Sequence, residues 1–81
     1  QTAEIYLDMG NFSLALEFCQ RALAIDNCLE LAYRLSLRIY AAMGDRAAVV
    51  KQYSRCCEVL EREINTRPSV QTESLYLELL K

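Results

Sequence analysis

The 81-residue chain is 53% hydrophobic and 25% charged, with two glycines and one proline. This length suits one small domain and excludes a two-domain enzyme, and the composition excludes a disordered or collagen-like chain. Nine basic and eleven acidic residues give a net charge of −2, whereas nucleic-acid-binding modules usually carry a strong basic excess, so we expect no direct contact with nucleic acid. Histidine, the commonest general base and metal ligand, is absent, so we expect neither catalysis nor a cofactor or metal.

The four cysteines, at positions 19, 28, 56 and 57, do not form the C-x-x-C pairs typical of zinc sites. Adjacent helical residues point about 100° apart, so Cys56 and Cys57 are poorly placed to bind one zinc ion. Disulfide scaffolds are rich in loops, whereas this sequence is rich in helical patterns. We therefore expect Cys19 and Cys56 to be small, buried, unpaired side chains in a reducing compartment.

No apolar run approaches the roughly 20 residues that a membrane-spanning helix needs, and residues 1–4 do not begin an export signal. We therefore expect a cytoplasmic protein with no membrane partner. The chain begins with Gln1 rather than methionine, so we expect it to be a segment of a longer protein.

Apolar residues recur at steps of three or four along the whole chain, which predicts an all-α fold of about five helices. The first helix is expected around Ile5 and Met9, the third over residues 29–43 and the fourth over residues 47–64. Breaks between helices are predicted where turn and capping residues occur. These breaks are Gly10–Asn11, Asp26–Asn27, Gly44–Asp45 and Asn65–Pro68.

The last helix is expected to begin after Pro68, with Ser69 as its N-cap. Leu75 and Leu79 then form an apolar stripe on that helix, while Thr72 is an unfavourable residue for a helix interior.

An internal repeat becomes visible when the sequence is shifted by 34 residues, the period of the tetratricopeptide repeat. The matched pairs are Tyr6 with Tyr40, Met9 with Met43, Gly10 with Gly44, and Asn11 with Asp45. We therefore expect antiparallel tetratricopeptide-like helix hairpins that stack into a right-handed α-solenoid. Residues 1–64 would form two hairpins, the first truncated at its N-terminus, and residues 65–81 a turn and a C-terminal capping helix of the same domain.

Residues 10–26 resemble the turn and second helix of a tetratricopeptide repeat, with Gly10, Phe12, Ala15 and Ala22 at the positions characteristic of that family. The second copy departs from the pattern, because its corresponding residues after the glycine are an arginine, a valine and a cysteine. These residues are Arg46, Val49 and Cys56.

A narrower family fits the whole chain. Residues 32–35, 41–48 and 52–56, followed by the closing segment 60–69, resemble the bacterial transcriptional activator domain of antibiotic-regulatory-type activators. Asn65 stands where that family usually has glycine, and asparagine also tolerates a left-handed backbone. The resemblance implies the later part of an all-helical, non-catalytic domain that mediates self-association or relays signals to a separate DNA-binding domain.

The repeat also predicts a partner-binding groove, because the first helix of each repeat lines a concave surface. The groove residues are Glu4, Leu7 and Asp8 from the first unit, and Leu31, Arg34 and Arg38 from the second. Arg34 and Arg38 lie one turn apart and would form a fork for a partner's carboxylate or phosphate. The alternative is that Glu30, four residues before Arg34, neutralises it within the domain.

Charge is unevenly distributed along the chain. Residues 31–57 hold five basic residues and one acidic residue, whereas residues 1–30 hold one and five, and residues 58–81 hold three and five. A basic centre between acidic flanks suits head-to-tail self-association or intramolecular pairing better than DNA binding, although it is also compatible with solvated helix faces. We further expect Ala3, Ile5 and Met9 to be exposed and to promote homo-oligomers.

Two functions are therefore predicted. The first is a protein-interaction and oligomerisation domain of a bacterial transcriptional regulator. The second is a general tetratricopeptide scaffold that binds a peptide in its concave groove. The gene sequence upstream of Gln1 distinguishes them, since the first function predicts a winged-helix pattern there and the second predicts further repeats.

Overall fold

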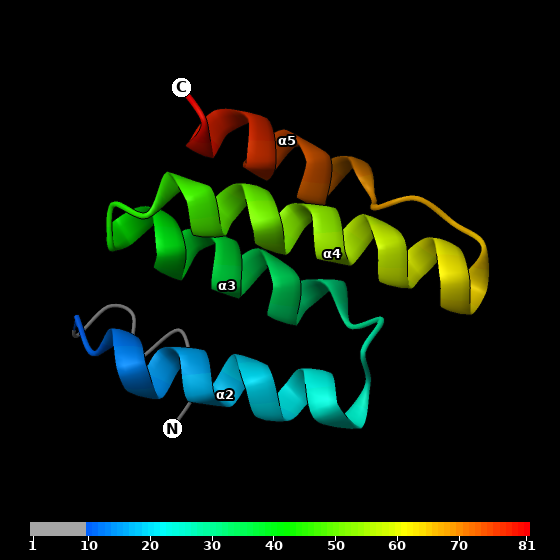
Figure 1. The fold of residues 1–81 in the computed structure, drawn as a ribbon, viewed down its shortest axis with the longest axis horizontal. Coiled ribbons are helices and arrows are strands. Elements are labelled where there is room, and N and C mark those ends of the chain that lie inside the picture. Colours follow the sequence, from blue (N-terminus) through cyan, green and yellow to red (C-terminus); the bar gives the residue numbers. More distant parts are fainter. Residues whose placement is uncertain (1–9) are drawn as a thin grey trace.

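The computed structural model describes residues 10–81, in which it places four helices and no strands (Figure 1). The helices are α2 (Phe12–Ile25), α3 (Glu30–Ala42), α4 (Arg46–Ile64) and α5 (Val70–Leu79). The predicted all-α fold is confirmed for this part of the chain. The predicted breaks at Asp26–Asn27, Gly44–Asp45 and Asn65–Pro68 separate the four helices, and α2 begins directly after Gly10–Asn11. The expected first helix, around Ile5 and Met9, lies outside the described residues.

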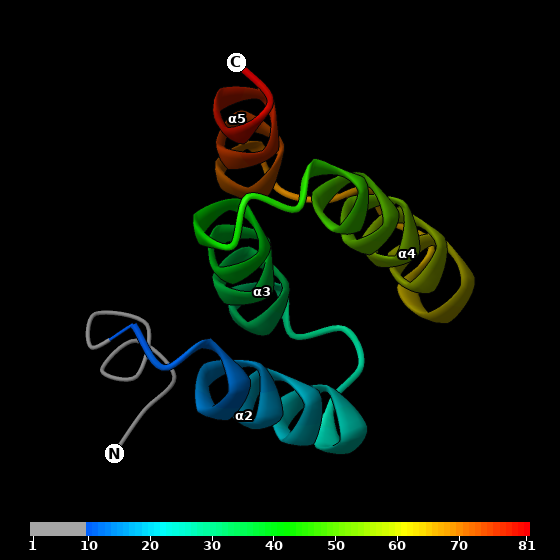
Figure 2. The same ribbon diagram turned by 60° about the vertical axis from the view of Figure 1, so that its left-hand side comes forward.

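Helix α3 is the centre of the arrangement, because it packs against α2, α4 and α5. Successive helices run antiparallel (Figure 1), and Figure 2 shows α3 between α2 and α5, with α4 beside it. Five α3 residues are accordingly buried, more than in any of the other three helices. They are Ala32, Tyr33, Ser36, Leu37 and Ile39.

The two glycine turns of the repeat have the same conformation. Gly10 has φ 76° and Gly44 has φ 77°, a left-handed region that glycine enters without steric cost. The residue after each glycine is an N-cap: Asn11 accepts a hydrogen bond from the Leu14 amide, and Asp45 accepts one from the Ala48 amide. The 34-residue match is therefore a match of turn geometry as well as of sequence.

Small side chains allow the helices to approach closely. Ala15 and Cys19 of α2 are buried against Ile39 of α3. Cys56 of α4 is buried against Tyr33 of α3. Both cysteines are buried, as predicted, and carry free thiols.

The link between α4 and α5 follows the predicted capping. Asn65 ends α4 with φ 50° and ψ 48°, the left-handed conformation expected for the residue that replaces glycine. Ser69 caps α5, and its hydroxyl accepts a hydrogen bond from the Thr72 amide. Tyr76 of α5 stacks on Tyr53 of α4, with ring centroids 3.8 Å apart. None of the helices in residues 10–81 combines the length and the apolar character that crossing a bilayer requires.

Candidate functional site

Helix α3 presents two opposite faces to its surroundings. At 100° per residue, Leu31, Arg34 and Arg38 fall on one side of α3, and the tyrosines at positions 33 and 40 fall on the other. The first is the predicted concave face. The second forms the floor of a groove that sequence reasoning did not predict.

The predicted concave face is only partly free. Leu31 is 49% exposed and Arg38 is exposed, but Arg34 is half-buried and its Nη1 donates to Thr72 Oγ1 of α5 at 3.1 Å. The structure therefore places these three predicted residues on one face of α3 and engages Arg34 in a hydrogen bond within the fold. The other predicted residues, Glu4, Leu7 and Asp8, lie outside the described residues.

Glu30, Arg34, Ser69 and Thr72 form a polar cluster that we call the α3–α5 junction. Glu30 Oε1 accepts a hydrogen bond from the Ser69 amide at 2.8 Å and one from Thr72 Oγ1 at 2.7 Å. Thr72 is fully buried, so its hydroxyl depends on these protein partners. A residue that the sequence marks as unfavourable inside a helix thus joins α5 to α3.

The junction also fixes the protonation state of Glu30. Burial acts to raise the pKa of this carboxyl group, but the hydrogen bonds from Ser69 and Thr72 and the charge of Arg34 outweigh it. The pKa of Glu30 therefore lies below its ordinary value. Arg34 thus acts on Glu30 through its charge, while its hydrogen bond goes to Thr72.

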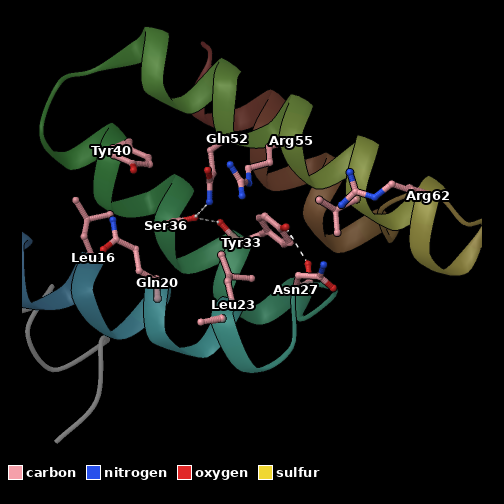
Figure 3. Close-up of a pocket in the computed structure, with 13 residues that line it drawn as sticks. Leu16, Gln20, Leu23, Asn27, Tyr33, Ser36, Tyr40, Gln52, Arg55 and Arg62 are labelled. Carbon is pink, nitrogen blue, oxygen red and sulfur yellow. Dashed lines mark hydrogen bonds between the residues drawn. The ribbon is translucent and has the colours of Figure 1, made fainter.

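On its opposite side, α3 forms the floor of a groove of about 460 Å³ between α2 and α4 (Figure 3). We call it the α2–α4 groove. Its walls carry apolar and uncharged polar side chains together with two arginines. The lining residues are Leu16, Cys19, Gln20, Leu23, Ala24, Asn27, Tyr33, Ser36, Tyr40, Gln52, Arg55, Val59 and Arg62.

The groove floor is fixed by hydrogen bonds. The Tyr33 hydroxyl donates to the Asn27 carbonyl oxygen at 2.8 Å, and the Ser36 hydroxyl donates to the Tyr33 carbonyl oxygen at 2.8 Å. Gln52 of α4 donates to Ser36 Oγ at 3.1 Å, so it ties one wall to the floor (Figure 3). These hydrogen bonds therefore hold Tyr33, Ser36 and Gln52 in defined positions.

The charged side chains of the groove are basic. Arg55 and Arg62 are both exposed on α4, and none of the described residues that line the groove is acidic. Burial raises the pKa of the Tyr33 hydroxyl, and the charge of the neighbouring Arg55 opposes that rise. Arg62 pairs with Glu63 at 3.2 Å, but both side chains of this pair are well exposed, so we expect it to be weak.

A second hollow continues the groove along α4. It shares Tyr40, Gln52 and Arg55 with the first and extends to Lys51 and Glu58. The second hollow therefore adds one basic side chain, Lys51, and one acidic side chain, Glu58, to the surface of α4 next to the groove.

The two buried cysteines, Cys19 and Cys56, do not offer reactive thiolates. Burial raises the pKa of Cys19 to about 11 and that of Cys56 to about 12, which keeps both thiols protonated at neutral pH. Within residues 10–81, no three His, Cys, Asp or Glu side chains cluster as metal ligands would.

One sequence signal could have revealed the groove. Tyr33, Ser36 and Tyr40 are spaced three and four residues apart, so polar and aromatic groups share one helical stripe. The stripe also lies between two segments that the repeat predicts to be helices. The Thr72 contact has no such signal, because Glu30 and Thr72 are 42 residues apart.

Comparison with known proteins gave one match. The family model described as "Bacterial transcriptional activator domain" matches residues 1–80. The match does not support the expectation that only the later part of that domain is present. No curated protein matches the chain significantly. The same is true of solved structures.

Proposed function

The chain belongs to the bacterial transcriptional activator domain family, and from this premise we propose that it is a non-catalytic protein-interaction and oligomerisation domain. In this proposal it self-associates and passes a signal to a separate DNA-binding domain of the same regulator. The location would be cytoplasmic, and this segment itself would not bind DNA.

One observation carries the self-association. On α5, Val70 is 81% exposed and Leu77 is 55% exposed. They lie seven residues apart, close to two helical turns, and so form one apolar stripe on the outer face of α5. In stacked helical repeats, such a stripe is normally covered by the next helix. A second copy of the domain would cover it here.

Sedimentation velocity over a wide concentration range tests this proposal. The wild-type chain is expected to show a sedimentation coefficient that rises with concentration. The variant Val70→Lys/Leu77→Lys is expected to remain monomeric, because lysine removes the apolar stripe and adds repulsion between copies. Ile25→Lys is the matched control, since Ile25 is 89% exposed at the end of α2, away from α5. A wild-type chain that is monomeric at every concentration contradicts the proposal.

The second candidate is a peptide-binding scaffold that uses the concave face of α3. It is favoured by the exposure of Leu31 beside Arg38, an apolar contact next to a positive charge. Arg38→Glu is expected to weaken partner binding without loss of helicity under this function. Unchanged affinity in Arg38→Glu would reject it.

A further inference from the structure

The α2–α4 groove is chemically distinct from both surfaces considered above. It lies on the side of α3 away from Arg34 and Arg38 and does not include the α5 stripe. Its floor is held by Tyr33, Ser36 and Gln52, so an occupant would meet a formed surface. A preformed groove reduces the ordering cost of binding.

The groove has the form of a helix-binding surface. Helices α2 and α4 run in the same direction on either side of α3 (Figures 1 and 2), and residues of all three helices line the groove. Leu16 and Leu23 contribute apolar surface from α2, and Val59 contributes it from α4. Amphipathic helices bind apolar grooves of this kind by inserting apolar residues at three- and four-residue spacing.

Charge complementarity determines the chemistry of the occupant. Arg55 and Arg62 lie seven residues apart on α4, so they share one face and are about 10 Å apart along its axis, from the 1.5 Å rise per residue. No acidic side chain is among the described residues that line the groove, and Arg62 pairs at 3.2 Å with Glu63, an exposed contact that we expect to be weak. Two carboxylates on a partner helix, also seven residues apart, would match this spacing.

We infer that the α2–α4 groove binds an acidic amphipathic helix of a partner protein, with apolar residues on the α3 floor and two carboxylates paired with Arg55 and Arg62. The inference rests on the proposed function as an interaction domain and names the partner chemistry for one surface of it. Acidic residues on α5 of a second copy fit less well, because Glu73 and Glu78 are five residues apart and therefore point in different directions.

The test uses a fluorescent 15-residue helical peptide with leucines at three- and four-residue spacing and two glutamates seven residues apart. A second peptide carries lysines in place of the glutamates. Fluorescence anisotropy is expected to show that the wild-type chain prefers the glutamate peptide, and that added salt weakens binding. Equal affinity for the two peptides, or no binding of the glutamate peptide, overturns the inference.

The decisive variant is Arg55→Glu/Arg62→Glu, the groove double variant. It is expected to lose at least about tenfold in affinity for the glutamate peptide and to gain affinity for the lysine peptide. Arg21→Glu/Arg67→Glu is the matched control, because it makes the same change in net charge outside the groove. Circular dichroism confirms that each variant is folded. An equal loss in the control shows a general charge effect and overturns the inference.

Two further measurements identify other occupants. If duplex DNA binds the wild-type chain and is lost only in the groove double variant, the groove binds nucleic acid and the inference is wrong. If the groove double variant abolishes self-association, the occupant is a second copy and the inference is also wrong. The groove inference and the proposed function can fail separately. If the glutamate peptide does not bind but Val70→Lys/Leu77→Lys still abolishes self-association, the groove inference is wrong and the proposed function stands.

Discussion

The two faces of α3 use arginine in different ways. On one face, Arg34 is half-buried and donates to Thr72, which also donates to Glu30. On the other, Arg55 of α4 is exposed at the edge of a groove whose described lining residues include no carboxylate. The comparison shows that net charge alone does not reveal the role of an arginine, since Arg34 is half-buried in a hydrogen-bonded cluster whereas Arg55 is exposed at the edge of a groove.

The largest effect on stability is expected from Thr72→Val, which keeps the shape of the side chain and removes its hydroxyl. Glu30 and Arg34 each lose a hydrogen bond, so the free energy of unfolding should fall by about 1–3 kcal/mol. Urea unfolding measures this change. The matched control is Thr66→Val in the exposed α4–α5 link, which should change stability by less than about 0.5 kcal/mol. Equal stability of both variants would show that the junction does not hold α5.

The pH dependence of stability tests the role of Glu30 in the same α3–α5 junction, with Thr72 unchanged. Because the folded-state pKa of Glu30 is lowered, its contribution is fully present above the ordinary value of 4.5 and is lost as the pH falls through the folded pKa. Chemical unfolding between pH 7 and pH 3 should therefore show a decline in stability below about pH 4.5 that is smaller in Glu30→Gln. Identical pH profiles for the wild type and Glu30→Gln would contradict the assigned role.

A smaller loss is expected on the groove face from Ser36→Ala. Ser36 is 2% exposed and its hydroxyl accepts from Gln52, so the variant should lose about 1 kcal/mol of stability. Thermal unfolding against the exposed control Ser54→Ala measures the difference. If Ser36→Ala is more destabilising than Thr72→Val, hydrogen bonds in the groove floor contribute more to stability than those in the α3–α5 junction.

The smallest stability effect is expected from the groove double variant. Arg55 and Arg62 are exposed, so replacing them should change the free energy of unfolding by less than about 0.5 kcal/mol. Urea unfolding of the variant and of wild type measures this. A loss of several kcal/mol would mean that these arginines belong to the fold, as Arg34 does.

Much of the fold could be predicted from sequence because its causes are local. Helical periodicity, the glycine turns and the N-caps at Asn11, Asp45 and Ser69 each depend on residues within a few positions. The left-handed Asn65 was expected from the family resemblance, because that family usually has glycine at this position. The roles of Thr72 and Tyr33 could not be predicted, because each depends on which residues from another part of the chain the packing brings alongside.

The candidate site likewise has features that local sequence predicts and features that depend on distant residues. Helical spacing was sufficient to place Leu31, Arg34 and Arg38 on one face. It did not indicate that Arg34 would be engaged by Thr72, 38 residues later. The α2–α4 groove arises from three helices together, so no single segment of sequence displays it.

The central claim is that α3 separates a face that holds the fold from a face that is available to a partner. Peptide affinity measured side by side on the wild-type chain, the groove double variant and Arg38→Glu tests it most directly. We expect the groove double variant to lose at least about tenfold in affinity for the glutamate peptide while Arg38→Glu retains wild-type affinity. A loss in Arg38→Glu with full affinity in the groove double variant would contradict the claim and place the partner on the concave face.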